Sequence, residues 1–112
     1  MTILLLPGIK KCVAVPVEEI VRIEASSNYS RIHFASGKKI TATKILHWFE
    51  DALPADMFAR VHRSHLINKS FVQKLIGTHS KTLLLHNGEM ISISRRKRMS
   101  VVEQCHTSAV ES

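Results

Sequence analysis

Residues 19–34 read EIVRIEASSNYSRIHF and predict two antiparallel β-strands joined by a tight turn. Residues 19–24 include β-branched side chains with a period near two, which is typical of a strand. The polar cluster at 26–28 indicates a turn. Alternation along residues 29–34 places successive side chains on opposite faces. One face carries Tyr29, Arg31 and His33, and the other carries Ser30, Ile32 and Phe34.

Working outward, the flanking sequence predicts further strands and one helix. Ser36-Gly37-Lys38 predicts a hairpin turn, and residues 39–42 predict the returning strand. Before the pair, residues 11–15 alternate weakly and stop at Pro16. After it, Thr43 is a suitable N-cap for a helix that ends at Pro54. The apolar stripe of this helix consists of Ile45, Leu46, Trp48, Phe49 and Leu53.

The second half of the chain also has strand patterns. Residues 59–68 are strand-like but unusually polar, and residues 71–76 predict another strand. Residues 82–85 and 90–93 predict a hairpin, because Asn87-Gly88 supplies the positive φ angles of a turn. Residues 95–104 fit a short amphipathic helix capped by Ser94. We therefore expect a mainly β fold of packed antiparallel sheets, with one short internal helix and a short C-terminal helix.

The charge distribution favours a polyanionic partner. The chain has 112 residues, enough for one domain, and a net charge of +7. Residues 1–56 hold seven basic and six acidic groups, whereas residues 57–112 hold nine basic and three acidic groups. A concentrated positive field suits nucleic acid, because each neutralised phosphate releases counterions. A solvated basic face explains the charge equally well, so charge alone leaves both open.

The residues that could support catalysis or metal binding do not form a recognisable site. His62 and His65 lie three apart in a strand-like segment, which separates them onto opposite faces, and no carboxylate is near in sequence. Cys12 and Cys105 have no metal-binding spacing and indicate reduced thiols. Nucleophile-elbow and phosphate-loop motifs are absent from the sequence. We expect no enzyme activity, metal or cofactor.

The N-terminal sequence gives no sign of a membrane or secreted protein. Its longest uninterrupted apolar run, at 3–6, is far short of a membrane span, and no signal peptide precedes it. We therefore expect a cytoplasmic protein without a membrane partner.

Hydroxyl, amide and guanidinium donors cluster at residues 26–31, 60–69 and 92–98. Such groups bind phosphate oxygens, and arginine can grip guanine with two hydrogen bonds. Turn formation and surface solvation explain each cluster alone at least as well. All three together in a basic chain favour nucleic-acid binding.

The same clusters carry a resemblance to a known family. Residues 58–68, FARVHRSHLIN, resemble the F-x-R-x-H-R-S-x-x-V-N signature of the LytTR family of bacterial DNA-binding domains. Residues 23–29, IEASSNY, resemble its I-E-A-x-x-N-Y strand and turn, and Leu53-Pro54 its usual helix end. Residues 91–96, ISISRR, resemble its closing I-P-V-S-R-R. The matches span roughly residues 10–102 in the right order.

The resemblance implies a transcription regulator whose loops, rather than a recognition helix, enter the major groove. It places the DNA-binding domain at residues 10–104, after an N-terminal extension at 1–9 and before a C-terminal tail at 105–112. LytTR domains commonly act as response-regulator output domains behind a phosphorylatable receiver, which these residues do not contain. A stand-alone regulator and a fragment of a longer protein both remain open.

The family's contact positions imply a set of DNA-binding residues. Base contacts fall on the turn from Asn28 to Arg31, with Ser30 nearest the contacting position, and on Arg63 and Arg95. Backbone contacts or supports fall on Ser64, His65, Asn68, Arg96 and Lys97. Alternation makes Arg60 and His62 braces of the loop rather than contacts.

The expected partner is double-stranded DNA, bound at paired direct repeats with self-association on the DNA. One alternative is a small β-barrel protein that binds single-stranded nucleic acid by stacking bases on aromatic rings, for which only Tyr29 and Phe34 are available. Another is an interaction module for an acidic protein.

Overall fold

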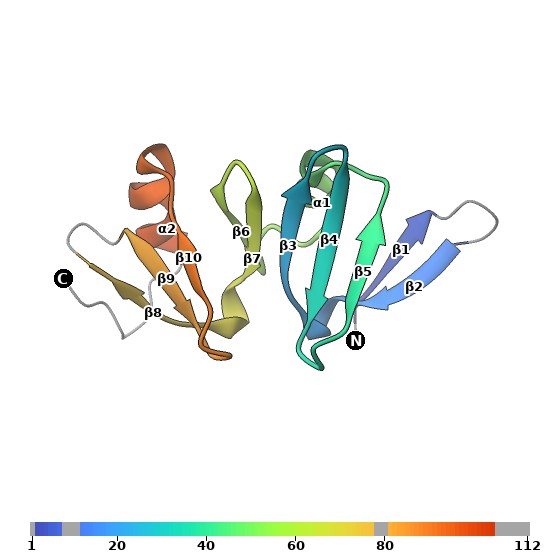
Figure 1. The fold of residues 1–112 in the computed structure, drawn as a ribbon, viewed down its shortest axis with the longest axis horizontal. Helices are drawn as coiled ribbons and strands as arrows, with labels where there is room; N and C mark the ends of the chain where they lie inside the picture. Colours follow the sequence, from blue (N-terminus) through green and yellow to red (C-terminus); the bar gives the residue numbers. More distant parts are fainter. Residues whose placement is uncertain (1, 8–11, 78–80, 105–112) are drawn as a thin grey trace.

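Three antiparallel sheets form the core of the fold (Figure 1). The computed structural model describes residues 2–7, 12–77 and 81–104. The central sheet has five strands, in the order β5 (Lys39–Ala42), β4 (Tyr29–Phe34), β3 (Ile20–Ser26), β7 (His65–Asn68) and β6 (Phe58–His62). The second sheet has the order β10 (Met90–Ser92), β9 (Thr82–Leu85) and β8 (Val72–Ile76). The third pairs β1 (Ile3–Pro7) with β2 (Cys12–Pro16).

Helical structure in the described residues is limited to short segments. Helix α1 spans Leu46–Ala52 and α2 spans Arg98–Gln104. Single 3-10 turns occupy Val17–Glu19 (η1), Lys69–Phe71 (η2) and Arg95–Lys97 (η3). The expected mainly β class, with one internal and one C-terminal helix, is confirmed.

The strand pair at residues 19–34 forms as predicted. Ser26 pairs with Tyr29, so Ser27 and Asn28 make a two-residue turn. Ser27 has a φ of 58°, the left-handed backbone that a primed hairpin turn requires at its first central position. On β4, Ser30, Ile32 and Phe34 are buried, whereas Tyr29 and Arg31 are exposed.

Both faces of the central sheet are covered by apolar packing. On one face, Ile23 and Ile32 pack with Phe49 of α1 and with Leu4 and Val15 of the β1–β2 hairpin. On the other face, the members of the cluster come from β3, β6, β7, the three-stranded sheet and α2. They include Val21, Val61, Ile67, Leu75, Leu83, Leu85 and Val101. Strand β3 therefore contributes to two hydrophobic cores.

The first helix begins later than the sequence predicts. Ile45, not Thr43, occupies the N-cap position, with extended backbone angles and no side-chain capping bond. Its side chain is 58% exposed, so its predicted place in the apolar stripe is wrong. The reason lies in β4, where the Ser30 hydroxyl donates to the Lys44 carbonyl at 2.7 Å and fixes the segment before the helix. The helix ends at Ala52, because the residue before Pro54 disfavours helical angles.

Residues 59–68, expected to be strand-like, fold into a hairpin. Strands β6 and β7 are joined by a two-residue turn at Arg63-Ser64, with His62 paired to His65. The predicted cap at Ser94 is also corrected, because its side chain makes no capping bond and the 3-10 turn η3 precedes α2. Residues 105–112, the expected tail, lie outside the described residues.

Residues 3–7 of the expected extension form β1, which pairs along its length with β2. Leu4 and Leu6 lie in the first hydrophobic core. These residues are therefore part of the folded unit.

A charged contact ties the central sheet to the three-stranded sheet. Arg22 of β3 is buried, and its Nε and Nη2 donate to the two carboxylate oxygens of Glu89 at 3.1 and 3.0 Å. Glu89 lies in the β9–β10 turn, where Gly88 adopts a φ of 91°. The arginine lowers the pKa of Glu89 to about 2.

The molecule is elongated, with principal extents of 48, 27 and 22 Å. The two-stranded sheet lies at one end of the long axis and the three-stranded sheet at the other (Figure 1). Within the described ranges, no helix is long and apolar enough to cross a membrane.

Candidate DNA interface

Two of the three polar clusters meet at one end of the central sheet, where turns join β3 to β4 and β6 to β7. Ser30 pairs with Ala25 on β3 and with Ala42 on β5. The Ala25 N–H donates to the Ser64 carbonyl at 2.9 Å, which draws the β6–β7 turn to the same level. The β3–β4 and β6–β7 turns therefore lie side by side at the upper edge in Figure 1.

The third cluster joins them from the opposite side of β6. The Ser94 N–H donates to the Val61 carbonyl at 2.9 Å, and the Lys97 N–H donates back to the Ser94 carbonyl at 2.9 Å. Residues 94–98 are thereby held beside the end of β6. We call this edge the loop rim, made of residues 26–29, 63–64 and 94–98.

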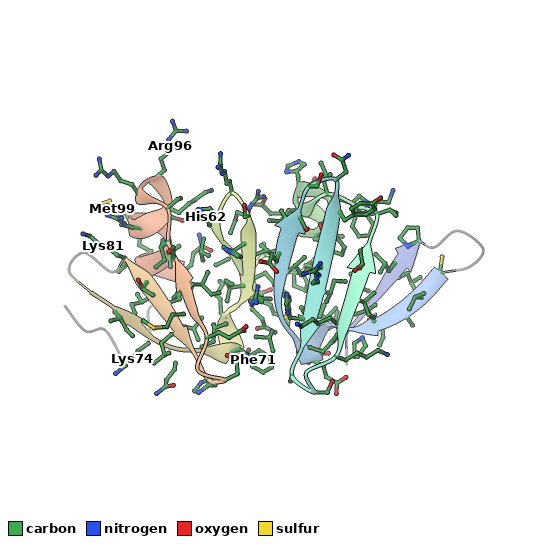
Figure 2. All side chains as sticks on the ribbon, viewed as in Figure 1. His62, Phe71, Lys74, Lys81, Arg96 and Met99 are labelled. Atoms are coloured by element: carbon green, nitrogen blue, oxygen red, sulfur yellow. The ribbon has the colours of Figure 1, made fainter. Side chains whose placement is uncertain are left out.

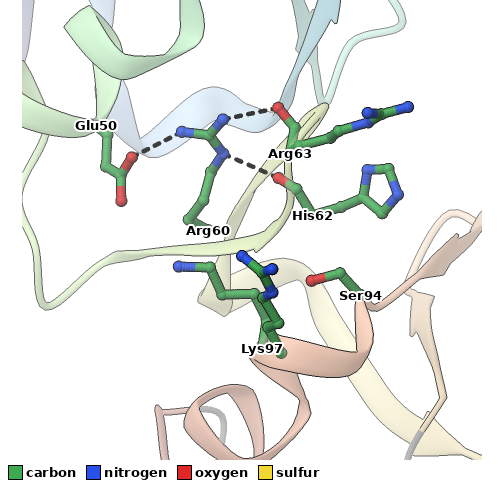
Figure 3. Close-up of a pocket in the computed structure, with 7 residues that line it drawn as sticks. Glu50, Arg60, His62, Arg63, Ser94 and Lys97 are labelled. Carbon is green, nitrogen blue, oxygen red and sulfur yellow. Dashed lines mark hydrogen bonds and ion pairs between the residues drawn. The ribbon is translucent and has the colours of Figure 1, made fainter.

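Arg60 and His62 brace the β6–β7 turn from within (Figure 3). Arg60 donates to the carbonyls of His62 at 2.9 Å and Arg63 at 2.7 Å, and pairs with Glu50 of α1 at 2.7 Å. The Ser64 N–H donates to Nδ1 of His62 at 3.1 Å. Neither turn residue has a positive φ, so this turn lacks the primed backbone that usually closes two-residue hairpins. Side-chain hydrogen bonds supply its rigidity instead, and the predicted bracing roles are confirmed.

The bracing leaves Arg63 available for a ligand. Its carbonyl is engaged by Arg60, but its side chain is exposed and points away from the bracing contacts (Figure 3). Among the described residues, its guanidinium makes no hydrogen bond or ion pair. A two-residue turn thus presents one cation at its tip.

A groove of about 680 Å³ opens between this turn and η3. It is lined by Glu50, Arg60, His62, Arg63, Ser94, Arg96 and Lys97. Arg60 already neutralises Glu50, so the remaining side chains give the groove a net positive lining. Figure 2 shows Arg96 projecting beyond the ribbon at this edge. Arg95 is exposed like Arg96, and Lys97 is half-buried.

Two predicted contact residues are buried and have structural partners. Ser30 is 0% exposed and donates its hydroxyl to Lys44. Asn68 is also 0% exposed. Its amide donates to the Ile20 carbonyl at 2.8 Å, and its side-chain oxygen accepts the Ser70 N–H at 2.9 Å. Neither presents a surface to DNA, so in this conformation both are supports.

His65 lies just below the turn and also has the position of a support. It is half-buried, and its ring centroid is 5.4 Å from that of His62. Burial, and next the charge of Arg22, lower the pKa of His65. A neutral imidazole contributes little attraction to phosphate at neutral pH. Of the other predicted contacts, Asn28 and Arg31 are exposed and Ser64 is half-buried.

The sequence did not indicate the link between α1 and the rim. Glu50 holds Arg60 across ten positions of sequence, and no local pattern marks such a contact. Among the residues that the structure describes, no group of three potential metal-ligating side chains comes together.

The family comparison agrees with this geometry. The family model of the LytTr DNA-binding domain matches the sequence over residues 10–106, nearly the whole chain. The chain belongs to the LytTr family.

The LytTr domain is thus a DNA-binding domain, and solved structures share its fold. One similar structure is the LytTr DNA-binding domain of a putative methyl-accepting/DNA response regulator from Bacillus cereus. The two are 24% identical, with a TM-score of 0.79 over 96% of this chain and 99% of that one. No curated protein matches this LytTr domain significantly.

Proposed function

We propose that the protein is a sequence-specific regulator of transcription that reads duplex DNA with the loop rim. The observation that carries this proposal is the convergence of three polar clusters on one edge, with Arg63 and Arg95 both exposed there. Arginine reads guanine in the major groove through two parallel hydrogen bonds. Loops that project from a rigid sheet can deliver such side chains without a recognition helix.

The geometry supports a division of roles on the rim. Arg63 and Arg95 are the proposed base readers. Groups beside them are suited to phosphate and sugar, and consist of Asn28, Arg31, Ser64, Arg96 and Lys97. The supports beneath them are Ser30 and His65. Asn68 is a support at the other end of β7, where it holds η2 to the start of β3.

Exposed aromatic rings are too few for stacking along a single strand. Tyr29 is 51% exposed, but Phe34 is buried in the first hydrophobic core. A single-strand binder needs successive aromatic platforms, which the described surface does not offer. The single-stranded alternative is therefore not favoured.

The decisive experiment selects bound duplexes from a random pool and then measures two variants on the selected site. Arg63→Ala should lose about 1–3 kcal/mol of discrimination between the selected site and a scrambled duplex. Lys97→Ala should weaken binding to both duplexes by a similar factor, since phosphates carry no sequence information. If Arg63→Ala keeps the full preference for the selected site, Arg63 is not a base reader.

The remaining features of the proposal follow from a DNA-binding role. We propose a non-catalytic bacterial protein that acts in the cytoplasm, and that two copies occupy direct repeats and associate on the DNA. Residues 10–104 supply the loops of the rim, and β1 pairs with β2 and packs into the first hydrophobic core. Sedimentation of the protein with one-site and two-site duplexes would measure the stoichiometry directly.

A further inference from the structure

The segment Thr43-Lys44-Ile45, between β5 and α1, reaches the same edge as the loop rim. Ala42 is the last residue of β5 and pairs with Ser30, which pairs in turn with Ala25. Ala25 is the residue bonded to Ser64 of the β6–β7 turn. The chain beyond Ala42 therefore leaves the sheet level with the turns of the rim, and Figure 1 shows it crossing the upper edge.

Ile45 is an unusual residue for the place that it occupies. Ser, Thr, Asp and Asn stabilise helix N-caps, whereas isoleucine has no oxygen to accept the unpaired N–H groups. Ile45 stands at the N-cap without a side-chain capping bond, and it is 58% exposed. Ile45 thus departs from two rules, because it provides no capping oxygen and it exposes a large apolar side chain. Such departures are expected where function competes with stability.

The backbone around Ile45 is held on both sides. Ser30 donates to the Lys44 carbonyl, and the Trp48 N–H donates to the Ile45 carbonyl at 3.1 Å. The Lys44 ammonium lies 5.7 Å from the centre of the Trp48 ring. A β-branched side chain on a fixed backbone has few rotamers, so Ile45 presents a preformed apolar surface.

Helix α1 couples this surface to the β6–β7 turn. The same helix carries Glu50, which holds Arg60 and through it the Arg63 carbonyl. Ile45 and Arg63 are thus positioned by the two ends of one short rigid element.

We propose that Ile45 contacts the 5-methyl group of a thymine in the bound duplex, and so adds an apolar specificity contact to the polar ones. The inference rests on the proposed function, because it requires the rim to lie in the major groove. There, the thymine methyl is the apolar group that distinguishes the base pairs, and small apolar side chains are suited to contact it.

The test replaces thymines one at a time with deoxyuridine in the selected duplex, which removes only the methyl group. For the unmodified protein, one position should weaken binding by about fourfold, the effect of one buried methyl. Ile45→Ala should abolish the difference between thymine and uracil at that position. Leu5→Ala is the matched control, because Leu5 is an apolar side chain that is 63% exposed on β1 and does not belong to the rim. It should leave the profile unchanged.

A second variant separates the contact from folding. Ile45→Ser introduces a good N-cap, so its Tm should rise while its response to the methyl group disappears. A selected site without any uracil-sensitive position, or an equal response in Ile45→Ala and the unmodified protein, would overturn the Ile45 contact and leave the proposed function standing. Failure to select any preferred sequence would overturn both.

Discussion

Arg60 links three backbone and side-chain groups that otherwise have no fixed relation. Its guanidinium joins the carbonyls of His62 and Arg63 to Glu50, and the planar fork of donors is what makes this possible. Lysine keeps the charge but has a single compact head group. Arg60 therefore fixes the backbone of the turn that presents Arg63.

Arg60→Lys should lower affinity for the selected duplex by about tenfold, with a much smaller effect on scrambled DNA, because orientation is lost and charge is kept. Fluorescence anisotropy on both duplexes measures the two effects. Glu50→Gln is the companion variant and should also lower affinity for the selected duplex, by a smaller factor. Equal losses on both duplexes would indicate a phosphate contact instead of a positioning role.

Asn68 is a buried polar residue whose hydrogen bonds stabilise the fold. Replacing it with alanine leaves the buried Ile20 carbonyl and the Ser70 N–H without their partners. We expect a loss of about 1–3 kcal/mol in the free energy of unfolding, measured by urea denaturation. Binding by the fraction that remains folded should be nearly unchanged. A direct role in DNA binding would show the reverse pattern.

At the scale of elements, most strands and the turns at 26–28, 36–38 and 87–88 were predictable, whereas β1 and the Arg63-Ser64 turn were not. Alternation in residues 29–34 gave the correct faces, because only one face of β4 is buried. The turn at Arg63-Ser64 was missed, since neither residue has the glycine or asparagine signal of a hairpin and the turn depends on Arg60. Ser30 and Asn68 were assigned by resemblance to the contact region, but burial depends on neighbours distant in sequence.

The Arg22–Glu89 pair is the charged link between the second sheet and the first. The pKa of Glu89 is lowered from 4.5 to about 2, so its carboxylate stabilises the fold fully above pH 4.5. That contribution is lost as the pH falls toward 2. Glu89→Gln should cost about 1–3 kcal/mol at pH 7, because buried Arg22 loses its closer anion and keeps Glu24 at 3.6 Å.

Comparison of Glu89→Gln with the unmodified protein isolates this contribution from two nearby histidines. Burial lowers the pKa of both His33 and His65, so stability due to them already falls as the pH drops below 6.5. Both proteins share most of that loss, because Glu89 comes last among the causes of the shift in the pKa of His33. Urea denaturation at a series of pH values should show the two stabilities converging below pH 4.5. A constant difference down to pH 2 would mean that Arg22 does not lower the pKa of Glu89.

At the scale of the whole molecule, the rim concentrates positive charge on one long edge. Each phosphate contact releases counterions and contributes about −0.9 to the slope of log K against log salt. Lys97→Ala should therefore make the measured slope less steep by about 1, whereas Leu5→Ala should leave it unchanged. Equal slopes for Lys97→Ala and the unmodified protein would remove Lys97 from the phosphate contacts.

The 48 Å length of the molecule sets how closely copies can follow one another on a promoter. One turn of B-form DNA is about 34–36 Å long, so a body lying lengthwise covers more than a turn. Two copies one turn apart on the same side would overlap. The next in-phase spacing is two turns, about 21 base pairs, and operators of this protein should have half-sites at that period or further apart.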